Sequence, residues 1–196
     1  MEQQQTGRPL QGKRIAMLMA DGVEQIEYTS PRSFLEGQGA TVVLVAPKAA
    51  GEDIQGVDHD QPGERFRVEL DVGGANPDDF DALVLPGGAE NPRHLRASPA
   101  AIDFIRGFDI DAKMVAAICH GPLSLIDAGI ASAKHVTSAP DAKEELQAAG
   151  AEWTDDPVVI DARLVTSRTP DDLAAFNDSM LKELMVAEGT DPGPTS

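Results

Sequence analysis

The 196-residue chain is short of several residue types, and each shortage excludes a class of protein. It has one cysteine, Cys119, so no disulfide forms within the chain. That side chain is a buried small hydrophobe, a reactive thiol or an intermolecular bridge. Basic residues number 16 against 33 acidic ones, a net charge of −17. Most of the surface would repel a phosphate backbone, so we expect no nucleic acid as a main partner.

Long apolar runs and cofactor motifs are also missing. No apolar run approaches the roughly 18 residues of a membrane helix, and the N-terminal stretch has no apolar core of a secretory signal. We therefore expect a cytoplasmic protein with no membrane partner. The histidines and the cysteine lack zinc-site spacing, and Pro-Gly-Gly at 86–88 lacks the lysine of a P-loop. We predict no metal, no nucleotide and no other cofactor.

What the sequence does contain is an alternation of apolar runs and helical patterns. Nearly continuous aliphatic runs, typical of strands buried on both faces, occur at 14–20, 41–47, 81–88 and 113–119, and a shorter one at 163–168. Helical spacing recurs at 30–39, 98–108, 140–150 and 169–186. This order predicts a doubly wound α/β sandwich around a mostly parallel sheet.

Two kinds of segment depart from that alternation. Residues 51–72 are rich in turn formers, so we predict a small β excursion at the sheet edge. Residues 1–12 and 189–196 are polar, and we expect them to be loose tails. The chain between them, residues 13–188, is predicted to form a single domain, because it contains no linker and no internal repeat.

Cys119 stands where an apolar strand turns into a predicted helix, followed by His120, Gly121 and Pro122. Together with Ala117, this is the small-x-nucleophile-x-Gly spacing of a nucleophile elbow, in which the turn is too sharp for larger neighbours. The following helix would point its N–H groups at the sulfur, so we expect a lowered pKa of the thiol. The alternative is a structural cysteine at a strand end.

Two other strand ends are expected beside this cysteine. Glu24 and Glu27 follow the first strand, one helical turn apart, and either could be a proton partner of the thiol or a solvated acid at a helix start. Gly87 and Gly88 follow the third strand. Paired glycines bring bare N–H groups close to a ligand, as an oxyanion hole requires, although they also form plain turns.

The segments 81–96, 115–129 and 165–177 resemble the ThiJ/PfpI superfamily of the class I glutamine amidotransferase-like fold. The nearest branch is the bacterial PfpI-like group of intracellular proteases, general stress proteins and deglycases. The resemblance implies a flavodoxin-like three-layer sandwich and a homodimer or a larger assembly. It also implies Cys119 as nucleophile and His120 as its neighbour.

The resemblance assigns further roles by position. Glu27 matches the glutamate that hydrogen-bonds the cysteine, and Glu24 matches a second acid of that motif. Gly87, Gly88 and the His120 amide match the oxyanion donors. One departure stands out: protease-like members carry an acid that orients the histidine, and Arg93 occupies that position, with Glu90 as a substitute three residues earlier. A cation cannot hold an imidazolium, which disfavours a peptidase.

Three functions follow from this sequence. The first is glyoxalase- or deglycase-type chemistry, in which Cys119 attacks small carbonyl compounds or glycated adducts. The second is a non-enzymatic redox role in oxidative stress, through oxidation of Cys119 to sulfinic acid. The third is an intracellular cysteine peptidase, which Arg93 argues against.

The other histidines are read as surface or loop residues: His59 on the β excursion, His94 near the site mouth or a dimer contact, and His135.

Overall fold

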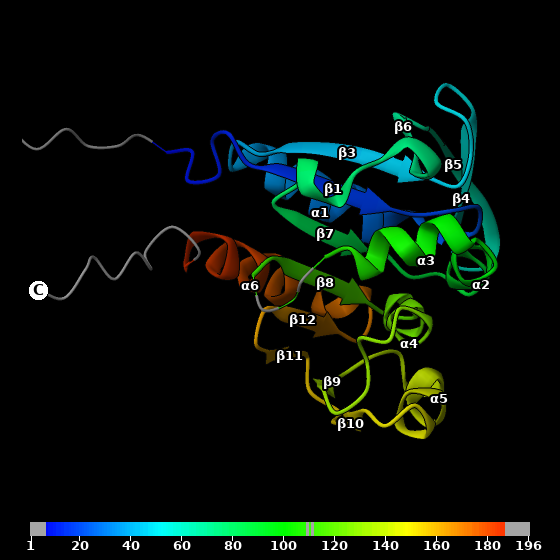
Figure 1. Ribbon diagram of the computed structural model, residues 1–196, viewed down its shortest axis with the longest axis vertical. Coiled ribbons are helices and arrows are strands. Elements are labelled where there is room, and N and C mark those ends of the chain that lie inside the picture. The colour runs from blue at the N-terminus through cyan, green and yellow to red at the C-terminus, as the bar shows by residue number, and fades with distance from the viewer. Residues whose placement is uncertain (1–6, 109, 111, 187–196) are drawn as a thin grey trace, which may run out of the picture.

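The structure is a computed structural model that describes residues 7–108, 110 and 112–186. Seven strands form the central sheet in the order β11-β12-β8-β7-β1-β3-β6 (Figure 1). Their bounds are β1 (Arg14–Leu18), β3 (Thr41–Ala46), β6 (Leu70–Asp71), β7 (Ala82–Leu85), β8 (Met114–Ile118), β11 (Val158–Asp161) and β12 (Leu164–Ser167). All neighbouring pairs are parallel except β11 and β12. The five strands expected from the apolar runs are confirmed.

Helices cover both faces of this sheet and complete a three-layer α/β/α sandwich (Figure 1). One face carries α1 (Gln25–Gly37) and α6 (Leu173–Val186). The other carries α2 (Asn91–Arg96), α3 (Pro99–Arg106), α4 (Ser124–Asp127) and α5 (Lys143–Ala148). Alternate buried residues of β1, β3, β7 and β8 enter the two separate cores, so the buried positions of these four strands are all apolar. The predicted fold class is confirmed.

Two small sheets and five short 3₁₀ turns complete the described structure. The predicted β excursion contains β4 (Asp53–Asp58) and β5 (Gln61–Arg67), an antiparallel hairpin that pairs with β2 (Val23–Glu24), whereas β6 joins the edge of the main sheet. A second sheet pairs β9 (His135–Val136) with β10 (Glu152–Trp153). The 3₁₀ turns are η1 (Val72–Gly74), η2 (Pro77–Asp79), η3 (Gly121–Leu123), η4 (Pro140–Ala142) and η5 (Pro170–Asp172).

The first helix differs from its prediction. Its pattern placed Pro31 in the first turn, but α1 begins at Gln25 and holds Pro31 in its interior. A proline there removes the N–H that would bond the carbonyl of Glu27, four residues earlier, and its ring crowds that carbonyl. Burial of Glu27 and Tyr28 on the core side holds the extra turn in place. This early start brings Glu27 onto a helix.

The chain ends also differ in part from expectation. Within the expected tail 1–12, Leu10 is fully buried and its N–H donates to the Gln38 carbonyl at 3.0 Å, so residues 7–12 pack against the domain. Residues 1–6 and 187–196, which include the expected C-terminal tail, lie outside the described residues. Among the helices of the described chain, none is both long and apolar enough to cross a membrane.

Candidate functional site

Cys119 occupies a sharp turn directly after β8. Its backbone has φ +61°, which is strained for a side chain other than glycine. Its N–H donates to the Ser167 carbonyl at 3.0 Å, and its carbonyl accepts from the Ala139 N–H at 2.8 Å. A Cβ at Gly121 would collide with the Leu85 carbonyl oxygen. These constraints are those of a nucleophile elbow, and they fix the half-buried thiol at the carboxyl end of the sheet.

The thiol is the first member of a chain of three side chains. Cys119 Sγ lies 3.3 Å from His120 Nδ1, and His120 Nε2 lies 2.9 and 3.0 Å from the two carboxylate oxygens of Asp141. Nε2 donates its proton to that carboxylate, which leaves Nδ1 as the acceptor that faces the thiol. The hydrogen bond from His120 is the main reason why the pKa of Asp141 lies below its usual value. The geometry is therefore that of a base oriented by an acid.

Asp141 corrects the expectation that His120 lacks an acid. The position of Arg93 was read as leaving the histidine unsupported, with Glu90 as a substitute. In the structure Arg93 lies 3.4 Å from Glu90 and both side chains are largely exposed. The acid on His120 comes instead from η4, 21 residues further along the chain. The argument against a Cys-His-acid site no longer holds.

Glu27 also lies beside the thiol of Cys119. Its side chain is fully buried, and Oε2 accepts the Gly87 N–H at 2.7 Å. Oε1 has no standard hydrogen-bond partner among the described residues, and the Cys119 thiol interacts with this carboxyl. Burial raises the pKa of Glu27 to about 8, against the opposing effect of the Gly87 hydrogen bond. Glu27 therefore keeps its proton at neutral pH.

The surroundings of Cys119 act on its own pKa in the direction opposite to our expectation. Burial raises the pKa of the thiol, and the neighbouring Glu27 carboxyl raises it further, while the N–H groups of Gly88 and His120 lower it. We expected the dipole of the following helix to lower this pKa. That dipole is weak, because only the three-residue η3 and the four-residue α4 follow the cysteine. The thiol therefore depends on a base to lose its proton.

The two glycines after β7 have different tasks. The Gly87 N–H is taken by Glu27, whereas the N–H groups of Gly88 and His120 point at the sulfur. Gly88 has φ +91°, and a Cβ there would collide with the Gly22 carbonyl oxygen. The amides directed at the reacting position are thus those of Gly88 and His120, while Gly87 holds Glu27 in place.

Asn91, which the sequence analysis did not single out, fastens this loop. Its fully buried amide accepts the Ala20 N–H at 2.7 Å and donates to the carbonyls of Pro86 and Gly87, each at 2.9 Å. It links the ends of β1 and β7 at the point where the strand order reverses. The only signal of this role in the sequence was the position of the asparagine, three residues after the Pro-Gly-Gly turn.

Glu24 lies next to this loop. Its N–H faces the Gly87 carbonyl at 3.4 Å, while its carboxylate accepts the His59 N–H at 3.0 Å. It stands close enough to Glu27 that its charge adds to the raised pKa of that group. The predicted residues Cys119, His120 and Glu27 are thus brought together, and Glu24 adjoins them through the β2 backbone.

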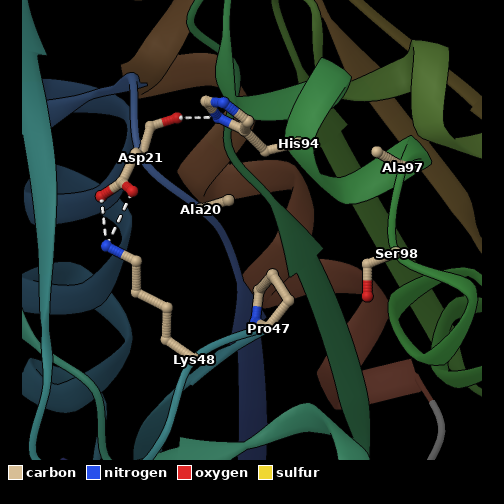
Figure 2. A pocket seen from close by; sticks show the side chains of 7 residues that line it. All are labelled: Ala20, Asp21, Pro47, Lys48, His94, Ala97 and Ser98. Carbon is tan, nitrogen blue, oxygen red and sulfur yellow. Dashed lines mark hydrogen bonds and ion pairs between the residues drawn. The ribbon is translucent and has the colours of Figure 1, made fainter.

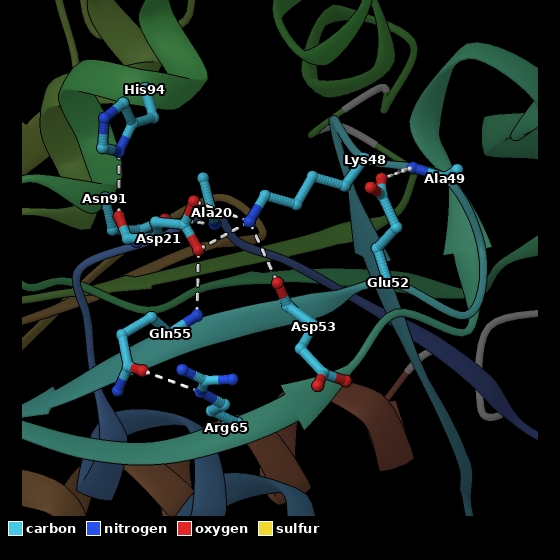
Figure 3. Close-up of polar contacts among 10 residues, drawn as sticks. All are labelled: Ala20, Asp21, Lys48, Ala49, Glu52, Asp53, Gln55, Arg65, Asn91 and His94. Carbon is cyan, nitrogen blue, oxygen red and sulfur yellow. Dashed lines mark hydrogen bonds and ion pairs between the residues drawn. The ribbon is translucent and has the colours of Figure 1, made fainter.

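A cavity of about 440 Å³ opens at the same end of the sheet, away from the thiol. Its lining residues are Ala20, Asp21, Pro47, Lys48, His94, Ala97 and Ser98. Asp21 lies between Lys48 and His94 (Figure 2). The Lys48 ammonium binds both Asp21 oxygens and the Asp53 carbonyl, and the His94 ring bonds the Asp21 carbonyl (Figure 3). The charged groups that line this cavity thus already pair with one another.

Known proteins similar to this chain identify its family. The DJ-1/PfpI family model matches residues 13–183. The chain belongs to the DJ-1/PfpI family. A Bacillus subtilis (strain 168) member with the name "Putative cysteine protease YraA" is 40% identical over 172 residues, which are 88% of this chain and 98% of that protein.

Solved structures of DJ-1/PfpI members share this fold. A two-domain protein from Anabaena variabilis with DJ-1/ThiJ/PfpI-like and ferritin-like domains gives a TM-score of 0.82 at 31% identity, over 88% of this chain and 48% of that one. Drosophila melanogaster DJ-1beta gives a TM-score of 0.77 at 26% identity, over 90% and 96% of the two chains. The family expected from the strand-end motifs is confirmed.

Proposed function

We propose that this DJ-1/PfpI protein is a cysteine-dependent enzyme of glyoxalase or deglycase type, acting on small ketoaldehydes such as methylglyoxal or on their adducts. One observation carries the proposal: a thiol on a strained elbow faces a histidine nitrogen at 3.3 Å, with Asp141 behind the histidine and a protonated Glu27 beside the sulfur. The thiol is only half-exposed, which favours a small substrate.

The first step forms a carbon–sulfur bond. Cys119 Sγ attacks the aldehyde carbon while its proton passes to His120 Nδ1, and the carbonyl oxygen takes the negative charge between the Gly88 and His120 amides. The imidazolium, held by Asp141, returns the proton to that oxygen, giving a hemithioacetal. Charge-directed amides of this kind contribute about 3–4 kcal/mol to such transition states.

The second step isomerises the adduct. A proton leaves the former aldehyde carbon, another is delivered to the neighbouring ketone carbon, and the hydroxyl proton of the adduct passes to the former ketone oxygen, which converts the hemithioacetal into a lactoyl thioester without net oxidation. Water then cleaves the carbon–sulfur bond and releases lactate and the free thiol. His120 and Glu27, which both lie beside the sulfur, are the groups that hold and return these protons.

Lactate formation tests this proposal. Purified protein incubated with methylglyoxal is expected to release lactate, and Cys119→Ser is expected to release none above the uncatalysed rate. Ser132→Ala is a suitable control, because Ser132 is exposed. Equal lactate from the wild type and Cys119→Ser would reject the enzyme.

A redox role is the second candidate, and the neutral Glu27 favours it. Two peroxide molecules would each transfer one oxygen atom to the Cys119 thiolate and leave as water, giving a sulfinate. A protonated Glu27 can donate a strong O–H···O⁻ bond to that product. Intact mass after a peroxide series should then show sulfinate in the wild type and a different product distribution in Glu27→Leu. Identical distributions would remove this candidate.

A peptidase is the third candidate. Asp141 supplies His120 with the acid that the sequence lacks at Arg93. The name of the Bacillus subtilis relative contains the words "cysteine protease". The half-buried thiol restricts access for a folded protein substrate. Casein hydrolysis that is lost in Cys119→Ala would support this function over the first; hydrolysis that persists in Cys119→Ala would come from a contaminant.

A further inference from the structure

A group of three potential metal ligands lies at the tip of the β4–β5 hairpin, outside the catalytic set. Asp58 is the last residue of β4, and His59 begins the turn with φ +55°. Glu24 ends β2, which pairs with β4 in parallel. One ligand atom from each of the three side chains lies within 4.8 Å of the other two.

Glu24 marks this group as more than a surface cluster of acids. The side chain is only 9% exposed, yet the residues described provide no hydrogen-bond partner for its buried oxygen Oε1. Oε2 accepts the His59 N–H at 3.0 Å, which directs the carboxylate at the hairpin tip. A buried, unpartnered carboxylate oxygen is costly, and a cation would satisfy it.

The spacing of the other two ligands suits a single ion. His59 Nδ1 lies 2.9 Å from Asp58 Oδ1. Two ligands that are each about 2.1 Å from a tetrahedral Zn²⁺ ion lie about 3.4 Å apart, so these two atoms need to separate only slightly. The side chains of His59 and Asp58 are 84% and 57% exposed, so both can rotate until their ligand atoms, now within 4.8 Å of that of Glu24, reach this spacing without disturbing the core.

We propose that Glu24, Asp58 and His59 bind one divalent transition-metal ion, with Zn²⁺ as the representative species. One imidazole and two carboxylates are a mixed nitrogen–oxygen set that favours such ions over Mg²⁺ and Ca²⁺, which prefer oxygen ligands alone. The two carboxylates balance the charge of the ion, and water completes its coordination on the exposed side of His59.

The spacing of cysteines and histidines in the sequence could not reveal this site, because Glu24 precedes His59 by 35 positions and only the β2–β4 pairing joins them. The ion would tie the hairpin tip to the β2 segment, whose backbone faces Gly87. The proposal does not depend on the function of Cys119.

Calorimetric titration of the untagged full chain with ZnCl₂ tests the proposal, with the Cys119→Ser variant as background so that the thiol cannot bind the metal. We expect one Zn²⁺ per chain, no binding of Mg²⁺ at the same concentration, and at least about tenfold weaker Zn²⁺ binding in His59→Ala and in Glu24→Gln. His135→Ala is the matched control: His135 is exposed and lies 2.5 Å from Glu152, another histidine–carboxylate pair.

His59 is an exposed turn residue, so His59→Ala is expected to keep the fold even if Glu24→Gln does not. Unchanged Zn²⁺ affinity in a folded His59→Ala would overturn the proposal. So would the absence of a one-to-one titration in the background protein, or a loss of affinity in His135→Ala equal to that in His59→Ala.

Discussion

At Asp141 a single carboxylate decides which nitrogen of His120 carries the proton. Because the carboxylate holds Nε2–H, the unprotonated Nδ1 faces Cys119 at 3.3 Å. Without this carboxylate the His120 ring could turn or take the other tautomer, and Nδ1 would no longer be a base that faces the thiol. Sequence reasoning missed this residue because Asp141 reads as an ordinary acid at a helix start, and only the tertiary fold brings η4 to the elbow.

Asp141→Asn should therefore lower kcat/KM for methylglyoxal by about 10²-fold or more, mainly through kcat. The side chain is 76% exposed, so the fold should be unaffected. Asp141→Glu should restore part of the activity. Because hydrogen bonding to His120 keeps the pKa of Asp141 low, the carboxylate stays ionised across the neutral range and can hold the ring there. Unchanged kcat in Asp141→Asn would contradict the assignment.

The raised pKa of Glu27 predicts how the free energy of unfolding depends on pH. Its pKa is about 8 in the folded protein and near 4.5 when exposed. Between these values the folded state holds a proton that the unfolded state has lost, so the free energy of unfolding should fall as pH rises, by at most about 1.4 kcal/mol per pH unit. Glu27→Gln keeps an acceptor for the Gly87 N–H and should lack this contribution.

Urea unfolding at pH 5, 6, 7 and 8 measures the effect. The exposed Glu144→Gln is the control for removing one charge. The wild type and Glu144→Gln should lose stability in parallel over this range, while Glu27→Gln should lose less. Parallel curves for all three proteins would show that the pKa of Glu27 is not raised.

Two turns between elements hold the site together. The turn after β8 needs Gly121 because the Leu85 carbonyl lies against it, and the turn after β7 needs Gly88 because the Gly22 carbonyl lies against it. Both contacts join neighbouring strands at the carboxyl edge of the sheet. The geometry of the thiol is thus set by packing between strand ends.

Gly121→Ala should lower the free energy of unfolding by about 1–3 kcal/mol, since its Cβ would meet a backbone oxygen that cannot move aside. Gly74→Ala, where the added Cβ meets nothing within 4 Å, should stay within about 0.5 kcal/mol of the wild type. Denaturant titration compares the two. Equal effects would mean that the elbow tolerates a side chain.

The elements differ in how far the sequence predicts them. Strands β1, β3, β7 and β8 are visible as apolar runs because both of their faces are buried. Helix α2 was not foreseen, since its six residues are too few for a periodic pattern and include Pro92. Cys119, His120 and Glu27 could be proposed from strand-end motifs, but the separate roles of Gly87 and Gly88 depend on distances that only the fold sets.

For the whole molecule, the parallel sheet gathers distant segments at one edge. Residues 27, 87, 119 and 141 meet there because the strands or helices that carry them end or begin at the same side. The net charge of −17 disfavours polyanions as partners of this molecule.

We expect a homodimer, as the family resemblance implied. Light scattering after gel filtration should give about twice the chain mass of 20.7 kDa, and 0.5 M salt should not dissociate it if apolar contacts dominate the interface. A mass equal to that of one chain at micromolar concentration would contradict this expectation.

The most direct test of the central claim follows the single thiol during turnover. Because the chain has one cysteine, its thiol content reports on Cys119 alone. With methylglyoxal in slight excess over enzyme, rapid quenching into a chromogenic disulfide should show the thiol disappear and then return as lactate is released. Lactate formed while the thiol content stays constant, or thiol lost permanently without lactate, would contradict the assignment of Cys119 as a catalytic nucleophile.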